Sequence, residues 1–181
     1  MSLPREIRTD RLLLRRWLAA DRPAFAALNA DALVMEHFPA VLTSEESDAL
    51  VDRIEEHFAE HGFGLWAVEV PGAVRFAGFV GLSIPRFDAH FTPCVEIGWR
   101  LAAEVWGHGY ATEAARAVLA FGFGSLELRE IVSFTVPENR RSRRVMERIG
   151  MLNEPSDDFD MPGALPRRHV LYRIARAPRP I

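Results

Sequence analysis

The sequence has no lysine, because all 22 basic residues among its 181 are arginine, and it has one cysteine, Cys94. Without lysine the chain cannot form a Schiff base with a carbonyl substrate, and it has no phosphate loop of the Gly-Lys-Ser/Thr type. A single cysteine excludes an internal disulfide. Cys94 begins an apolar stretch with no histidine beside it, so we interpret it as a small buried side chain and not as a nucleophile.

The first ten residues have no apolar core, since they carry Arg5, Glu6, Arg8 and Asp10. We therefore expect neither a signal peptide nor a membrane anchor there. The net charge of -3 and the pI near 6.1 argue against a general nucleic-acid binder, which needs a basic surface to neutralise phosphates. The expectation is a cytoplasmic protein that binds neither nucleic acid nor a membrane.

The hydrophobic pattern predicts one α/β domain over residues 1–181, with 49% hydrophobic residues to build its core. Alternating or β-branched runs predict strands at 12–17, 65–70, 74–84, 94–101, 130–136 and 169–174. Helical spacing and capping residues predict helices at 21–29, 32–37, 43–62, from 111 onward, and 139–149. Pro71-Gly72 predicts a hairpin turn, so the middle strands should be antiparallel neighbours in a mixed sheet.

Two glycines one residue apart, Gly107 and Gly109, separate a predicted strand from an alanine-rich helix. Such a turn can surround an anion with backbone N–H groups at the positive end of a helix dipole. A dinucleotide fingerprint would need a third glycine where Thr112 stands, and it would open a parallel βαβ unit. An anion site is therefore favoured over a dinucleotide site and over a tight turn with no ligand.

The glycine loop is accompanied by four further segments: Arg11–Arg15, Glu96–Trp99, Val136–Met151 and His169–Arg173. Together they resemble the Gcn5-related N-acetyltransferase (GNAT) family, in its ribosomal-protein N-acetyltransferase branch. That family's pyrophosphate loop reads Arg/Gln-x-x-Gly-x-Gly/Ala, and here Trp106, Gly109 and Ala111 stand at its marked positions. Trp106 replaces the usual polar residue, as in that branch, which leaves backbone contacts to the phosphates.

The resemblance implies a single domain with a curved, mostly antiparallel sheet that splays open after its central strand. It also implies an acetyl-CoA-dependent N-acetyltransferase without a metal, acting as a monomer or a homodimer. The acceptor would be a primary amine, either a small molecule or a protein N-terminus. A catalytically silent acetyl-CoA-binding domain is the alternative from another class.

The resemblance places the pantetheine arm of acetyl-CoA beside the central strand and the pyrophosphate on the glycine loop. The expected cofactor-binding residues are Ile97, Trp99, Arg100, Leu101, Trp106, Gly107, His108, Gly109, Tyr110, Ala111, Thr112, Asn139, Ser142 and Arg143. The pyrophosphate suits the unpaired N–H groups at a helix N-terminus. Ser142 is at the family's position for a hydroxyl near the cofactor sulfur, although serine is also common in a first helical turn.

Direct attack by an amine requires that the amine lose a proton first, so the site needs a base. Glu96 is the candidate, because its apolar neighbours Val95 and Ile97 would bury it and raise its pKa. A structural ion pair with Arg100 or another arginine is the alternative. A backbone N–H near Ile97 or Gly98 would hold the oxyanion, and Ser142 would protonate the departing thiolate.

The remaining motifs have two interpretations each. His57-Phe58-Ala59-Glu60-His61 matches a zinc-hydrolase pattern, but no third ligand follows and a helix surface is favoured. The basic run 140–148 is either a solvated helix face or a patch for the 3′-phosphate of CoA, and the acidic stretch 157–160 is either a solvated loop or an amine-recognition loop. Five side chains either line an acceptor pocket or belong to the core: Phe63, Trp66, Phe87, His90 and Phe91.

Overall fold

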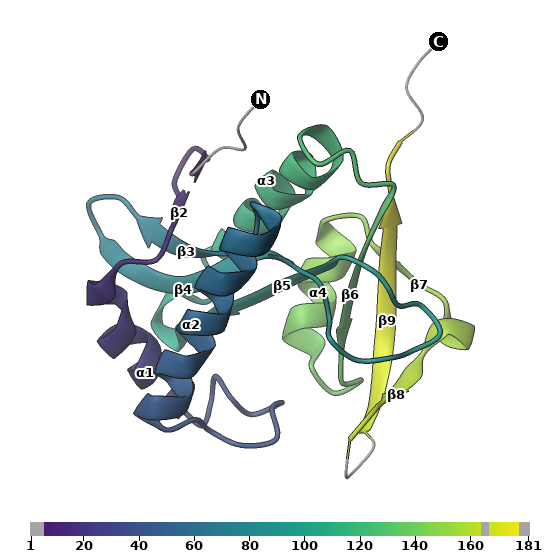
Figure 1. The fold of residues 1–181 in the computed structure, drawn as a ribbon, viewed down its shortest axis with the longest axis horizontal. Coiled ribbons are helices and arrows are strands. Elements are labelled where there is room, and N and C mark those ends of the chain that lie inside the picture. The colour runs from purple at the N-terminus through teal and green to yellow at the C-terminus, as the bar shows by residue number, and fades with distance from the viewer. Residues whose placement is uncertain (1–5, 164–166, 178–181) are drawn as a thin grey trace.

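In residues 6–163 and 167–177, which the computed structural model describes, the strands run in the order β1-β2-β3-β4-β5-β6-β9-β7, with β8 paired to β9 (Figure 1). The strands are β1 Ile7–Arg8, β2 Leu13–Arg15, β3 Leu65–Val70, β4 Val74–Ser83, β5 Glu96–Leu101, β6 Glu130–Thr135, β7 Leu152–Asn153, β8 Phe159–Met161 and β9 Arg167–Ala175. The helices are α1 Arg22–Ala30, α2 Ser44–His61, α3 Tyr110–Gly124 and α4 Arg140–Arg148, with 3-10 turns at Ala19–Asp21, Ala103–Val105 and Pro155–Asp157. This is the predicted single α/β domain.

The sheet is antiparallel between all neighbouring strands except β5 and β6, which are parallel. In the described residues these two strands share one register pair, Glu96 with Val132, supported by a 2.9 Å hydrogen bond from Val132 N to Val95 O. Beyond that pair β5 and β6 separate. The predicted opening after the central strand is therefore confirmed.

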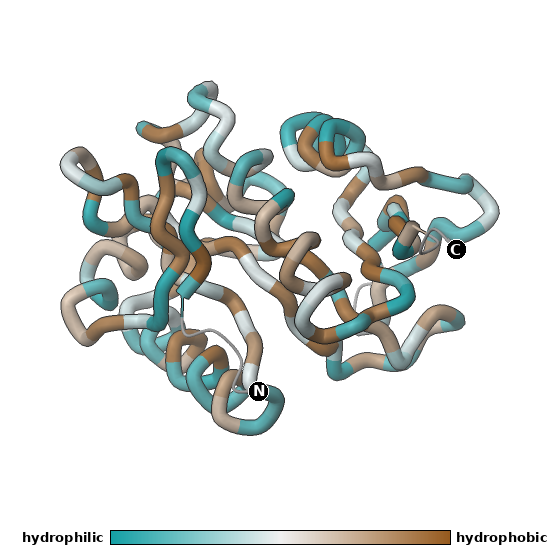
Figure 2. Tube along the Cα trace, turned by 90° about the horizontal axis from the view of Figure 1, so that it is seen from above, coloured by the Kyte–Doolittle hydropathy of each residue, from teal (hydrophilic) through white to brown (hydrophobic). Residues whose placement is uncertain are grey.

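Helices cover both faces of the central strands. On one face, Phe79 of β4 packs edge-on against Phe25 of α1 with ring centroids 5.9 Å apart, and His57 of α2 accepts a hydrogen bond from Ile84 N. On the other face, Leu82 lies against Gly122 of α3. Figure 1 shows α2 and α3 on either side of the strands, and Figure 2 shows hydrophobic residues gathered along the strands and the inner sides of the helices. The strands therefore form the centre of a helix, sheet and helix sandwich.

Two sequence predictions need correction at the local level. Residues 32–37 form turns and not the predicted helix. The Asp31 carboxylate accepts a hydrogen bond from Leu33 N at 2.8 Å, and Asn29 O is taken by Leu42 N, so the segment is tied back to the end of α1. An aspartate that bonds the backbone two residues on favours a turn over a helix. The predicted first strand, 12–17, is shorter in the structure, because only Leu13–Arg15 pairs with β3.

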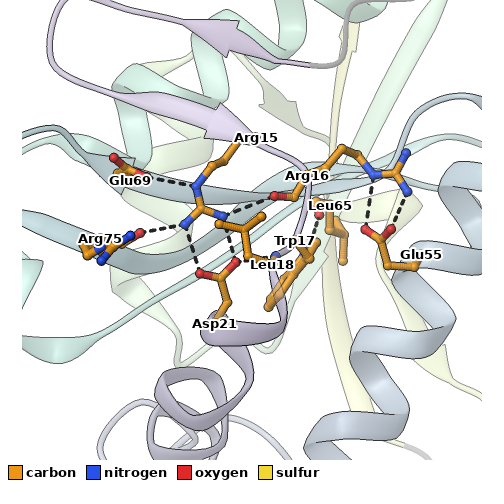
Figure 3. Close-up of polar contacts among 9 residues, drawn as sticks. All are labelled: Arg15, Arg16, Trp17, Leu18, Asp21, Glu55, Leu65, Glu69 and Arg75. Atoms are coloured by element: carbon orange, nitrogen blue, oxygen red, sulfur yellow. Dashed lines mark hydrogen bonds and ion pairs between the residues drawn. The ribbon is translucent and has the colours of Figure 1, made fainter.

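A buried ion pair fixes the start of the sheet against α1 (Figure 3). Arg15 of β2 donates to both carboxylate oxygens of Asp21, at 2.7 and 2.9 Å, and to Glu69 of β3 at 2.9 Å. Asp21 is 3% exposed and also accepts from Leu18 N. One guanidinium therefore holds together β2, β3 and the turn that precedes α1.

Replacing Arg15 with methionine should lower the free energy of unfolding by about 3 kcal/mol, because it leaves the buried Asp21 carboxylate unpaired. Arg16→Met is the matched control: the Arg16 and Glu55 side chains are 40% and 35% exposed, so its loss should be below about 1 kcal/mol. Urea unfolding at pH 7 measures both. Equal losses for the two variants would contradict the role given to Arg15.

Candidate active site

Glu96 lies at the point where the sheet opens. It is the first residue of β5, it pairs with Ser83 of β4 on one side, and it forms the single register pair with β6 on the other. Glu96 is half-buried, and desolvation raises its pKa to about 8, although a hydrogen bond with the Ser83 side chain opposes the shift. A carboxyl that titrates near neutral pH at an opening of the sheet can take up and release a proton.

The alternative interpretation of Glu96 was a structural ion pair with an arginine. Within the described residues no ion pair forms at Glu96, and burial alone lowers the pKa of Arg100 to about 10. Arg100 instead donates from Nη1 to Asn29 of α1 and lies against the rings of Phe38 and Phe79. The predicted pair between Glu96 and Arg100 is therefore absent from this part of the chain.

The edge of β5 that faces the opening includes four of the predicted cofactor residues: Ile97, Trp99, Arg100 and Leu101. None of these residues has a partner in β6 among the residues described. Backbone N–H and C=O groups that are shielded from water need partners, and an extended chain can supply them as another strand would. This edge can therefore bind an extended amide-containing chain.

The glycine loop joins β5 to α3 and has the backbone geometry that only glycine adopts readily. Gly107 and Gly109 have φ values of 82° and 81°, in the left-handed region. The first hydrogen bond of α3 runs from Glu113 N to Gly109 O, so the N–H groups of Tyr110, Ala111 and Thr112 precede the bonded helix. These N–H groups lie at the positive end of the helix dipole and can bind an anion.

The loop is held from outside by Arg11, whose guanidinium pairs with Glu113, donates to His108 O at 3.0 Å, and lies 4.9 Å from the ring of Tyr110. The ring of His108 stacks on that of Tyr110. The Trp106 indole donates to Leu101 O at 2.8 Å, which anchors the loop to the end of β5. The side chains of the loop therefore maintain its shape, and its backbone N–H groups remain free of these contacts.

The first turn of α4 lies beside the glycine loop, because the guanidinium of Arg141 lies 4.5 Å from the Trp106 ring and also pairs with Glu36. Asn139 caps this helix: its carbonyl oxygen accepts from Ser142 N, and its amide donates to Thr135. Arg143 donates to the Tyr172 hydroxyl and to Pro137 O. The structure thus brings the glycine loop and the first turn of α4 to the same opening beside β5. The contact of each with a cofactor stays a prediction.

A cavity of about 580 Å³ lies along the start of α3. Its lining residues are Thr9, Asp10, Arg11, Gly109, Thr112, Glu113, Arg116 and Arg148. Arg116 donates to Arg148 O, and neither arginine forms an ion pair within residues 6–163 and 167–177. Two arginines and a helix N-terminus make this cavity a suitable place for phosphate groups.

Several of the open motif interpretations are resolved by contacts. The ring nitrogens of His57 bond Phe63 O and Ile84 N, so this histidine joins backbone segments. Asp157 pairs with Arg173, and Asp158 accepts from Asn153 and from Leu171 N, so the acidic stretch is part of the local structure.

The aromatic and thiol side chains also have defined places. Phe63 and Trp66 belong to the main core, whereas Phe91 belongs to a second cluster that Phe87 packs against. His90 is exposed. Cys94 is partly buried, and burial raises the pKa of its thiol to about 11, as expected for an unreactive side chain.

The sequence predictions did not assign Arg11 or Ser83 to the site, and they included Arg141 only as part of the basic run 140–148 and not as a contact of the glycine loop. Arg11 and Arg141 act through contacts 102 and 35 positions away in the chain, and Ser83 reaches Glu96 only because of the β4–β5 register. The hairpin pattern could have indicated Ser83, since it aligns the end of one strand with the start of the next. No local pattern indicates the other two.

The acetyltransferase (GNAT) domain matches residues 11–152, and the chain therefore belongs to this family and is a GNAT acetyltransferase. The match includes β5, the glycine loop and α4. No helix in the described ranges has the length and apolar character that a membrane crossing requires.

Relatives and solved structures agree with this assignment. YnaD of Bacillus subtilis, named an uncharacterized N-acetyltransferase, is 33% identical over 149 residues, which are 82% of this chain and 83% of YnaD. The structure of a GNAT-family acetyltransferase from Bacillus anthracis is 30% identical, with a TM-score of 0.78 over 94% of this chain and 98% of that one. A Vibrio cholerae protein proposed to be a ribosomal-protein-serine acetyltransferase has the same fold, with a TM-score of 0.76, 19% identity, and coverage of 97% and 100%.

Gly107→Ala should destabilise the protein by about 1–2 kcal/mol, because alanine is strained in the left-handed region. A Cβ atom at Gly107 would meet nothing within 4 Å, so crowding cannot be the cause. Gly124→Ala is the matched control, since it also has open space but lies in α3 without a left-handed φ. The control should be neutral or stabilise by about 0.5–1 kcal/mol in thermal or urea unfolding. Equal effects of the two substitutions would contradict this account of the loop.

Proposed function

We propose that this chain transfers the acetyl group of acetyl-CoA to a primary amine by direct attack within a ternary complex. The single observation that carries the proposal is Glu96, a half-buried carboxyl with a pKa of about 8 at the only pairing of β5 with β6 in the described residues. An α-amino group has a pKa near 8 in water, so a base of similar pKa can accept its proton. Membership of an acetyltransferase family supports the same reaction.

Acetyl-CoA supplies the thioester, and the chain offers places for its other parts. We propose that the edge of Ile97 to Leu101 binds the pantetheine arm and that Gly107 to Thr112 bind the pyrophosphate through backbone N–H groups. The proposed donor site keeps Trp106 as a packing residue and includes Asn139, Ser142 and Arg143 at the start of α4. The cavity beside Arg116 and Arg148 suits the phosphorylated nucleotide end.

The residues of this chain would move two protons. Glu96 accepts the proton of the ammonium group, and the neutral amine then attacks the thioester carbonyl carbon. A backbone N–H of Ile97 or Gly98 holds the developing oxyanion. The C–S bond then breaks: the Ser142 hydroxyl, which the described contacts leave without a hydrogen-bond partner, donates a proton to the departing sulfur and takes up the second proton of the newly acylated nitrogen. No covalent acyl-enzyme is needed, because the attack is direct.

The acceptor is proposed to be a small amine or a protein N-terminus. The resemblance to ribosomal-protein acetyltransferases, and the shared fold of the Vibrio cholerae protein, favour the N-terminus, but the same fold serves many acceptors. A cytoplasmic monomer or homodimer is part of the proposal. A catalytically silent domain is not favoured, because Glu96 has the half-buried position and the raised pKa that proton transfer needs.

Glu96→Gln should lower kcat/KM by about 10²-fold or more, because glutamine cannot accept the amine proton. In the parent, kcat/KM should rise with pH and level off above about 8, since Glu96 must be ionised to act as a base. The measurement is thiol release from acetyl-CoA. The acceptor is an amine that titrates well below pH 7, so that the rise of kcat/KM with pH reports a group of the protein and not of the acceptor. Glu56→Gln, on the exposed side of α2, is the control.

The pH dependence of the stability of Glu96→Gln distinguishes the two interpretations of Glu96, a base or an ion-pair partner of an arginine. Because the folded pKa of Glu96 lies above its unfolded value, the folded parent binds an extra proton and loses stability as pH rises from about 4.5 to 8. Glu96→Gln has no such titration, so its stability relative to the parent should increase between pH 5 and pH 9. A relative decrease would mean that an arginine pairs with Glu96.

Ser142→Ala should lower kcat by about 10²-fold while leaving the KM for acetyl-CoA unchanged, because the hydroxyl acts on the leaving sulfur and not on binding. Ser125→Ala, an exposed serine at the end of α3, is the control. Initial rates at saturating acceptor provide the comparison. An unchanged kcat would exclude Ser142 as the acid.

A further inference from the structure

Arg100 is a charged group for which the described fold supplies no counter-charge. Its Nε is buried and has no hydrogen-bond partner, and no carboxylate of the described residues pairs with its guanidinium. Its one polar contact is from Nη1 to Asn29 Oδ1, a neutral acceptor. An unpaired buried guanidinium is unfavourable, which is why burial lowers its pKa to about 10.

The unpaired guanidinium is nevertheless held in a fixed place. Asn29 is fully buried, and its amide donates to Ser47 of α2 at 2.9 Å, which orients the carbonyl oxygen toward Arg100. The rings of Phe38 and Phe79 lie 4.2 and 5.6 Å from the guanidinium carbon. Nη1 is taken by Asn29 and Nε is shielded from solvent, whereas Nη2 has no partner among the described contacts. Nη2 is therefore the charged donor left for another acceptor, and a carboxylate is the acceptor that such a donor binds most strongly.

Arg100 shares one face of β5 with Glu96 and Gly98, because side chains two residues apart in a strand point the same way. Their register partners in β4 are Ser83, Gly81 and Phe79, and the Phe79 side chain packs on α1, so this is the face that α1 and α2 cover. A Cβ atom at Gly98 would meet only Glu96 Oε1, at 3.8 Å. Open space therefore lies between the carboxyl of Glu96 and the guanidinium of Arg100.

The loop that follows α1 adds an apolar surface near this space. Three of its side chains are large, hydrophobic and exposed: Leu33, Phe38 and Val41. Of these three, Phe38 contacts Arg100, so the loop places one exposed aromatic ring beside the charged group. An apolar side chain beside one charged group is common in sites for small ligands.

We propose that Arg100 binds a carboxylate of the acceptor, so that the preferred substrate is an amine that carries a carboxylate at a distance. This inference rests on the proposed function, because Glu96 marks the position of the amine. Glu96 and Arg100 are four residues apart along β5, which corresponds to about 13 Å of extended strand. Their side chains can shorten the distance between the carboxyl and the guanidinium. An extended tripeptide of about 10 Å has the required length between its amine and its C-terminal carboxylate, whereas a free α-amino acid is too short.

The test compares acceptors that differ only in the carboxylate. Tri-L-alanine and its C-terminal amide form one pair, and Ala-Asp-Ala-amide and Ala-Asn-Ala-amide form the second, which distinguishes a terminal from a side-chain carboxylate. Each peptide is titrated by calorimetry into the protein saturated with coenzyme A, and acetylation is measured separately. The parent should bind the carboxylate member of at least one pair about 10–100-fold more tightly.

Arg100→Met should abolish that preference by raising the Kd and KM of the carboxylate peptide toward those of its amide, because methionine keeps the apolar stem and removes the donors. Arg100→Lys should retain only part of the preference for the carboxylate peptide, since an ammonium group lacks the planar set of donors of a guanidinium. Arg75→Met, an exposed arginine of β4, is the matched control and should keep the full preference. Arg100→Met also leaves the buried Asn29 Oδ1 without its donor, so a single cooperative thermal transition should first establish that this variant is folded.

Equal binding of both members of both pairs by the parent would overturn the proposal, as would a preference that persists in Arg100→Met. A selective binding of the carboxylate peptides that depends on Arg100, without acetylation of any acceptor, would support the role of Arg100 and count against the proposed reaction. Acetylation of the carboxylate and amide peptides at equal kcat/KM would support the proposed reaction and count against the role of Arg100.

Discussion

The site depends on one interruption in the sheet. In the described residues β5 and β6 are joined at Glu96 and Val132 and then diverge, so the facing edges of both strands lack a partner beyond that pair. Unpaired backbone groups inside a fold are unfavourable unless something else binds them. The glycine loop at the far end of β5 and the first turn of α4 both lie at this opening, held to each other by Arg141 and Trp106. The fold thus leaves one edge of β5 without strand pairing beyond Glu96 in the described residues, with the N-terminus of α3 and the first turn of α4 beside it.

The alternation of β5 separates two kinds of chemistry within six residues. Ile97 and Leu101 are buried and belong to the main core, whereas Glu96, Gly98 and Arg100 point to the side that α1 and α2 cover. An amine that reaches Glu96 along that side would meet a thioester held at the edge of the same strand. The period of two in a strand thus separates the side chains of β5 that enter the core from those that face α1 and α2.

The parts of this architecture that the sequence predicts are those set by local rules. Gly107 and Gly109 indicate their own left-handed backbone, Thr43 and Glu46 indicate the start of α2, and Pro71-Gly72 indicates the β3–β4 hairpin, all of which the structure confirms. Residues 32–37 were wrongly predicted as a helix, because their apolar spacing is helical but the Asp31 side chain and the tie from Leu42 to Asn29 favour turns.

The contacts that position the site are of a different kind. Arg11 holds the glycine loop from the opposite end of the chain, and Arg100 lies under a loop that follows α1. The partner of each is decided by how whole elements pack, which no spacing in the sequence encodes. For this reason the sequence left two interpretations of Glu96 open, a base or an ion-pair partner of an arginine such as Arg100. In the structure, packing directs Arg100 to Asn29.

Two guanidinium groups, those of Arg11 and Arg141, contact the glycine loop and hold it in place. A guanidinium stays protonated at any physiological pH and is a poor nucleophile toward a thioester. The contacts that hold the loop therefore stay charged across the whole pH range in which the Glu96 carboxyl ionises.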